Sequence, residues 1–153
     1  IVKEIMADFD LVIAERKIQV VTEDLPVIDA VPDQMRQVFY SLIGNCIKFA
    51  RPEVALRIEI RSRLEHSVEG ARVALKRPFV RIDVSDNGSG FDEKYAEHIF
   101  EMFKKIHPRN EYEGTGIGLT IVRKIIEKHH GKIYAHGKEN EGATFTMVLP
   151  LKQ

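Results

Sequence analysis

Runs of alternating apolar residues constrain the fold of this chain most strongly. One pair covers residues 54–63 and 80–86, and a second pair covers 132–136 and 143–149. Alternation at every second residue predicts strands with one buried face. No helical pattern separates the members of either pair, whereas parallel neighbours need a long crossover that is usually a helix. The pattern therefore argues against a purely parallel sheet.

Helical periodicity fills most of the remaining chain. Helices are predicted at residues 1–17, 33–50, 92–103 and 118–129, and a short strand is predicted at 18–21. Asp33 is predicted as an N-cap after Pro32, and Gly131 as a C-terminal cap. Residues 64–77 are predicted to form a charged loop. The resulting fold class is α+β: a two-layer sandwich with a mixed, mostly antiparallel sheet and helices on one face.

Composition narrows the class of protein. The 153 residues are 44% apolar, which suits one domain over residues 1–153. Lys plus Arg and Asp plus Glu each number 23, so the basic excess of a nucleic-acid binder is missing. Cys46 is the single cysteine, and no apolar run reaches the ~20 residues that span a bilayer. Because the chain begins at Ile1, we expect a cytosolic piece of a longer protein, without direct membrane contact.

The helix at 33–50 carries polar residues beside its apolar face. Asn45 lies at the edge of the apolar arc, and Lys48 follows about one turn later. An amide oxygen suits Mg²⁺ and an ammonium suits a phosphate. A solvated helix face explains the same pattern, so this segment leaves both interpretations open.

The strand at 80–86 ends in a carboxylate that points toward the core. Asp86 continues the face of the preceding apolar residues, and burying it costs several kcal/mol unless a donor binds it. An adenine amino group is one such donor. Gly88 and Gly90 follow and permit a close approach of the backbone to a planar ligand. A turn-forming Asp is the alternative.

Residues 114–118 read Gly-Thr-Gly-Ile-Gly and lead directly into a helix. Free backbone amides and a helix N-terminus together favour an anion. A Walker loop is excluded because no Lys precedes Thr120, and a dinucleotide fingerprint because the preceding residues 110–113 are polar. A flexible hinge is the remaining alternative.

Taken in order, these segments resemble the catalytic domain of sensor histidine kinases over nearly the whole chain. The asparagine box matches residues 37–49, the two glycine boxes match 86–91 and 114–119, the phenylalanine box matches 99–105, and the last strand matches 140–150. Residues 105–113 are similar to the ATP lid of phytochrome-type and hybrid kinases.

The resemblance implies the Bergerat ATP-binding fold, shared with gyrase, the ninety-kilodalton chaperone and mismatch-repair ATPases. It implies that Asp86 accepts from the adenine amino group, that Asn45 binds Mg²⁺ and that Lys48 reaches the phosphates of ATP. It further implies that Lys105 approaches the terminal phosphate. The remaining implied ligand-binding residues line the base pocket (Gly88 and Gly90, with Phe91 packing nearby) or wrap the triphosphate (Gly114, Thr115, Gly116, Ile117, Gly118 and Leu119). Phe100 and Phe103 are expected to anchor the lid.

The same resemblance implies an ATP-dependent protein kinase whose phosphoacceptor histidine lies on a separate dimerisation domain and passes the phosphoryl group to a response-regulator receiver. None of the six histidines fits the acceptor motif, so the fragment should be a monomer that does not label itself, from a homodimeric parent. Ser41 departs from the family, which carries asparagine there, or glutamate in hydrolysing relatives. An anti-sigma-type serine kinase and a degenerate nucleotide sensor are the alternatives.

Overall fold

The computed structural model describes residues 1–65, 78–101 and 118–153 and confirms the predicted α+β sandwich. Its single sheet has the strand order β1-β2-β3-β5-β4. The strands are β1 (Gln19–Thr22), β2 (Arg57–Glu65), β3 (Phe79–Asp86), β4 (Lys132–Lys138) and β5 (Gly142–Pro150). Among the strands that the structure describes, only β1 and β2 pair in parallel, and the other three pairings are antiparallel.

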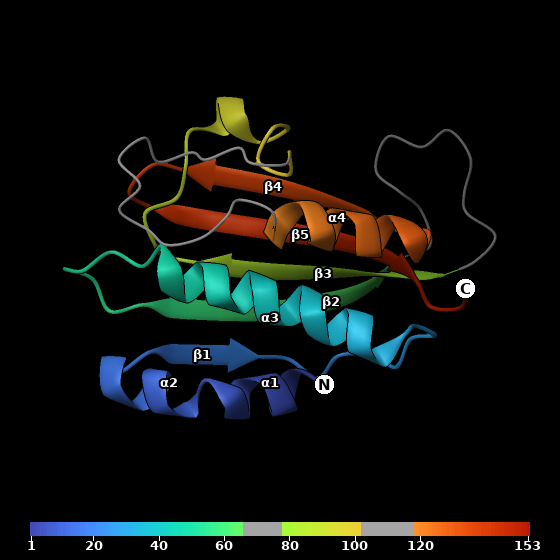
Figure 1. Ribbon diagram of the computed structural model, residues 1–153, viewed down its shortest axis with the longest axis horizontal. Coiled ribbons are helices and arrows are strands. Elements are labelled where there is room, and N and C mark those ends of the chain that lie inside the picture. Colours follow the sequence, from blue (N-terminus) through green and yellow to red (C-terminus); the bar gives the residue numbers. More distant parts are fainter. Residues whose placement is uncertain (66–77, 102–117) are drawn as a thin grey trace.

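The helix α3 (Pro32–Lys48) explains the one parallel pairing, because it is the crossover between β1 and β2. The helix α4 (Gly118–Lys128) runs beside α3, and the two cover the same face of the sheet (Figure 1). They run in opposite directions. The C-terminal end of α3 and the N-terminal end of α4 therefore lie at the same end of the molecule (Figure 1).

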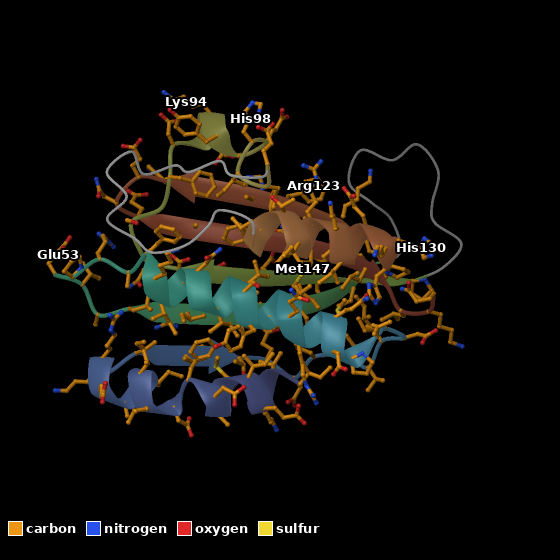
Figure 2. All side chains as sticks on the ribbon, viewed as in Figure 1. Glu53, Lys94, His98, Arg123, His130 and Met147 are labelled. Atoms are coloured by element: carbon orange, nitrogen blue, oxygen red, sulfur yellow. The ribbon has the colours of Figure 1, made fainter. Side chains whose placement is uncertain are left out.

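The core fills the space between this helical layer and the sheet. The strands contribute their alternate residues, and Figure 2 labels Met147, which is fully buried beneath α4. The helices contribute one face each: Met35, Val38, Phe39, Leu42, Ile43 and Cys46 from α3, and Val122, Ile125 and Ile126 from α4. Because all buried faces meet in one cluster, each layer requires the other for stability.

The predicted first helix is two helices. It breaks at Phe9 (φ −99°, ψ 3°) into α1 (Val2–Asp8) and α2 (Asp10–Arg16). The Phe9 ring packs on the ring of Tyr40 with centroids 5.0 Å apart, which fixes the break against α3. Helical periodicity cannot register this contact between α3 and the junction of the two helices.

Three further boundaries differ from the predictions. Asp33 is not the N-cap of α3; Val31 holds that position, and Asp33 lies in the first turn. The strand β2 begins at Arg57 rather than at residue 54. The helix predicted at 92–103 is a 3-10 turn, η1 (Glu93–Tyr95), followed by further turns as far as residue 100, and residues 102–103 lie outside the described part.

Gly131 does not provide the left-handed cap of α4. That conformation belongs to His130 (φ 61°), and Gly131 follows it by donating its N–H to the Ile126 carbonyl at 2.9 Å. A Cβ at Gly131 would collide with the Val148 carbonyl. Glycine is needed there for the close approach of β5, and not for the sign of φ.

The loop predicted at residues 64–77 begins later, because residues 64 and 65 belong to β2. Residues 66–77 and 102–117 lie outside the described part of the chain, so the rest of that loop and the lid stay predictions. Among the helices that the structure describes, none is long and apolar enough to cross a membrane.

The buried imidazole of His129 joins the two main helices at the far end of the molecule. It is 3% exposed, its Nδ1 lies 2.8 Å from the Ile125 carbonyl, and its Nε2 accepts the Val31 N–H at 3.1 Å. These contacts require the neutral tautomer that carries its proton on Nδ1. His129 thereby links the end of α4 to the start of α3.

We predict that His129→Ala lowers the free energy of unfolding by about 2–4 kcal/mol, because it removes both bonds and leaves a cavity and an unpaired N–H. Urea unfolding followed by circular dichroism measures this. The matched control is His130→Gly at the exposed neighbouring position (Figure 2). Because His130 has a positive φ, which glycine tolerates, this variant should change stability by less than ~1 kcal/mol. Equal losses in the two variants would contradict the proposed link.

Candidate functional site

Three of the segments singled out from the sequence meet at one end of the sandwich. The last turns of α3, the C-terminal end of β3 and the first turn of α4 lie together there (Figure 1). The antiparallel arrangement of α3 and α4 produces this convergence, since it brings a helix end and a helix start to the end of the sheet where β3 stops.

Asp86 is the last residue of β3 and lies opposite Ile58 and Ala143 in the sheet. Its Oδ1 accepts the Gly88 N–H at 2.8 Å. Burial raises the pKa of the Asp86 carboxyl above its ordinary value, and hydrogen bonds from Gly88, the Cys46 thiol and the Ala143 N–H oppose that rise only in part. The site therefore holds a carboxylate in a poorly hydrated position.

The protein itself thus supplies donors to this carboxylate, and burial alone does not demand a ligand. A carboxylate has about four acceptor positions. The three donors named above leave it capacity for a further N–H from a bound molecule. The sequence-based argument that burial of Asp86 demands a ligand donor therefore rests on an incomplete premise.

Cys46 is a member of the site that the sequence placed only in the core. Its side chain is 1% exposed on the face of α3 that meets β3. Burial, and then the negative charge of Asp86, raise the pKa of the Cys46 thiol well above its ordinary value. Cys46 therefore stays protonated and donates to Asp86. Cys46 directly follows Asn45 in the sequence. The helical wheel of α3, combined with the alternation of β3, could have identified the contact between Cys46 and Asp86.

The loop after Asp86 docks directly on the end of α3. The Ser89 N–H and the Ser89 hydroxyl both donate to the Phe49 carbonyl, at 2.8 and 3.0 Å. A Cβ at Gly88 would stand 2.6 Å from the same carbonyl oxygen. Gly90 has φ +62° and lies against the backbone of Lys138. Both glycines are thus required by close contact with other backbone segments of the protein.

The polar stripe of α3 adjoins this loop. Ser41, Asn45 and Lys48 are half-buried, at spacings of four and three residues along the helix. The Lys48 ammonium lies 5.5 Å from the centroid of the Phe49 ring. An amide and an ammonium at the margin of the core, near a carboxylate, can contact a cation and an anion.

The start of α4 adds backbone N–H groups. Gly118 is exposed and Leu119 half-buried, and the Thr120 hydroxyl donates to the Phe100 carbonyl at 2.7 Å. Phe100 is 4% exposed, as expected for an anchoring residue. This bond fixes the helix start to the turns that follow η1.

Phe91 lies in the core rather than at the surface of the site. It is 4% exposed, and a Cβ at Gly137 would stand 2.7 Å from its ring. Lys105 and residues 114–117 lie outside the described part of the chain, so their roles stay predictions. Within residues 1–65, 78–101 and 118–153, no His, Cys, Asp and Glu side chains cluster as a metal site.

The chain was compared with known protein families and with known proteins. Residues 30–153 match the family described as histidine kinase-, DNA gyrase B-, and HSP90-like ATPase. The chain is 39% identical over 140 residues to cyanobacterial phytochrome A of Nostoc sp., covering 91% of this chain and 17% of that protein. It is 31% identical over 128 residues to the adaptive-response sensory kinase SasA of Synechococcus sp., covering 84% and 31%.

Among solved structures, the nucleotide-free catalytic domain of the histidine kinase ThkA is similar to the whole sandwich. Its TM-score is 0.76 at 27% identity, over 99% of this chain and 92% of that one. The chain therefore spans under a third of the curated relatives named above but nearly all of a catalytic domain.

We predict that Asp86→Asn changes the pH dependence of stability. Because burial raises the pKa of Asp86, the native state binds more protons than the unfolded state between the ordinary value of 3.8 and the raised value. Stability from this group is therefore complete below 3.8 and falls as pH rises through that window. The urea midpoint of unfolding is measured at about five pH values between pH 3 and 7. The midpoint of Asp86→Asn should rise relative to that of the parent as pH rises.

Glu93→Gln is the control of opposite sign. Hydrogen bonds from the Gly137 N–H and from His136 lower the pKa of Glu93, so its stabilisation is present above its ordinary value and lost as pH falls. The parent should therefore be more stable than Glu93→Gln at neutral pH, and this difference in stability should shrink as pH falls. An Asp86→Asn profile parallel to that of the parent would contradict the assigned burial.

Proposed function

The chain belongs to the histidine kinase-, DNA gyrase B-, and HSP90-like ATPase family, and on that premise we propose that it binds Mg²⁺-ATP and donates the γ-phosphoryl group to a histidine on a separate dimerisation domain. Members of this family bind ATP, and the relatives named above include sensory kinases of two-component signalling. The observation that carries the proposal is the Asp86 carboxylate at the sheet end where the polar stripe of α3 and the start of α4 converge.

The adenine ring is proposed to bind at Asp86. The carboxylate is proposed to accept from the exocyclic amino group, and Gly88 and Gly90, which carry no side chains, are assigned to the margin of the base pocket. A neutral ligand donor suits this position because the carboxylate is already poorly hydrated. Phe91 supports the base pocket from within the core.

The triphosphate is proposed to extend from Asp86 toward the start of α4. Gly118 and Leu119 provide N–H groups at the N-terminus of α4, and residues 114–117 of the same motif are assigned to the triphosphate from the sequence alone. Lys48, and Lys105 of the phenylalanine box, are assigned to the phosphates.

The donor set at α3 fits Mg²⁺ of a nucleotide complex. Asn45 offers one amide oxygen, and Mg²⁺ keeps several waters and takes most other ligands from phosphates. When bound, Mg²⁺ would supply positive charge that offsets the negative charge of the triphosphate. Asn45 orients this complex relative to Lys48, from a helix whose end is fixed to the Asp86 loop.

Transfer to histidine needs no general base, since neutral imidazole is itself a nucleophile. Ser41 fits that chemistry, because a serine one turn before Asn45 cannot act as the base that activates water. We propose a separate phosphoacceptor domain and, beyond it, a response-regulator receiver as partners, in the cytosol, with a monomeric catalytic fragment from a homodimeric parent. Nucleic acid has no part in this proposal, given the balanced charge.

Ser41 also favours one second candidate. A serine ligates Mg²⁺ less well than the amide that the family carries, so a nucleotide-binding module without transfer is the rival function. Phosphotransfer to an added acceptor distinguishes the two.

We predict that calorimetric titration with Mg²⁺-ATP detects binding and that Asp86→Asn weakens it roughly ten- to a hundred-fold, since one charged hydrogen bond is lost. Asp83→Asn is the matched control. Asp83 lies on the opposite face of the same strand, where it binds Thr146 and Arg81. Unchanged binding in Asp86→Asn would contradict the adenine assignment.

The kinase assignment predicts that the fragment does not label itself with radioactive ATP. Adding the separately purified dimerisation domain of the parent should yield acid-labile, alkali-stable phosphohistidine on that domain. A Lys48→Met control should reduce the labelling, because Lys48 is assigned to the phosphates. Labelling of the fragment alone at one of its six histidines would contradict the proposed division of roles.

Ser41 variants test the choice between transfer and hydrolysis. We predict that Ser41→Glu raises ATP hydrolysis measurably at saturating ATP, by far less than the ~10²–10⁴-fold of a well-placed base. Ser41→Asn should tighten Mg²⁺-ATP binding without raising hydrolysis. Phosphate release and titration measure both. If neither variant differs from the parent, position 41 does not face the phosphates.

A further inference from the structure

The guanidinium of Arg51 holds the loop that follows Asp86. Arg51 lies in the segment between α3 and β2, and its Nε and Nη2 donate to the Asn87 carbonyl at 3.1 and 2.9 Å. Asn87 is the residue between Asp86 and Gly88, so this carbonyl lies within the peptide that sets the direction of the loop.

The rest of Asn87 is bound to the same segment. Its side-chain oxygen accepts the Arg57 N–H at 2.8 Å, and its side-chain amide donates to the Ala55 carbonyl at 3.0 Å. Its main-chain N–H donates to the Arg57 carbonyl at 3.3 Å. Residues 51–57 therefore fix Asn87 through its backbone and its side chain, and only Arg51 does so with a side chain.

An ion pair does not account for the position of Arg51. Within the described ranges 1–65, 78–101 and 118–153, its guanidinium forms no salt bridge. Its side chain is half-buried and donates to a neutral carbonyl oxygen. Neighbouring Glu53 lies at the outer tip of the segment (Figure 2). The planar fork of arginine can give two bonds to one oxygen, which the single ammonium of lysine cannot reproduce.

The Asp86 loop is thus held from two sides. On one side, the Phe49 carbonyl at the end of α3 accepts both bonds from Ser89. On the other side, Arg51 and its segment hold Asn87. Asn45 and Lys48 lie in the last turns of α3, directly before Phe49. The position of the carboxylate is therefore tied to the helix that bears the proposed metal and phosphate residues.

From this geometry we infer that Arg51 is a positioning residue for adenine recognition: it fixes the Asn87 peptide and thereby the distance from the Asp86 carboxylate to the amino group of the base. The inference rests on the proposed function. The inference deepens the proposed function by assigning discrimination between bases to a side chain that does not itself touch the nucleotide.

The test compares ATP with a purine nucleoside triphosphate that lacks the 6-amino group. Titrations of the parent, Arg51→Met, Arg51→Lys and Asp86→Asn, each with Mg²⁺, give the preference for the amino group as a ratio of affinities. Arg57→Met is the matched control, because Arg57 binds Asn87 only through its main chain while its side chain pairs with Glu59. Thermal unfolding confirms that each variant is folded at the titration temperature.

We expect Arg51→Met to weaken ATP roughly tenfold while the analogue changes little, so the preference falls by about the same factor. Arg51→Lys, which can give only one bond to the Asn87 carbonyl, should give an intermediate preference, and it carries the test alone if Arg51→Met does not fold. Arg57→Met should keep the preference of the parent. A general loss of packing would instead weaken both nucleotides equally, and that result would overturn the inference.

The outcomes also separate the inference from the proposed function. If Asp86→Asn abolishes the preference and both Arg51 variants retain it, adenine recognition stands and the role of Arg51 fails. If the parent shows no preference for the amino group, the assignment of Asp86 fails and the inference with it.

Discussion

The contact between the Asp86 loop and the end of α3 is the interaction on which the rest of the site depends. Ser89 donates twice to the Phe49 carbonyl, and Gly88 has no side chain that would keep the two segments apart. Without this contact, a strand end and a helix end would merely be neighbours. With it, a carboxylate on the sheet and an amide and ammonium on the helix occupy fixed relative positions.

That arrangement has an energetic cost that the fold tolerates. The Asp86 carboxyl is poorly hydrated, and its pKa is raised by burial in spite of three protein donors. Cys46 contributes one of these donors from within the core and remains a thiol for the same reason. A charge held in this way favours a ligand that brings another donor and little water, which is the character of an adenine edge.

The fold could be predicted from the sequence, as could the helix, strand or loop on which each described candidate residue of the site lies. Alternation defined β3 and its core-facing end at Asp86, and helical periodicity defined α3 and α4, because both patterns depend on local geometry. The ordered motifs indicated the family that the comparison then confirmed. The predictions of one continuous helix at residues 1–17 and of a helix at residues 92–103 were wrong, because the chain breaks at Phe9, which contacts Tyr40, and forms a 3-10 turn at η1.

Taken together, the sequence by itself determined which residues face the core, the α+β class and the chemistry available to a ligand. Only the tertiary structure decided that Cys46 donates to Asp86, that Arg51 holds Asn87 and that His129 joins the far ends of α3 and α4. The physical reason is distance along the chain. Periodicity reports neighbours within a few residues, whereas these hydrogen bonds join segments separated by 36 to 98 residues and exist only after the layers have packed.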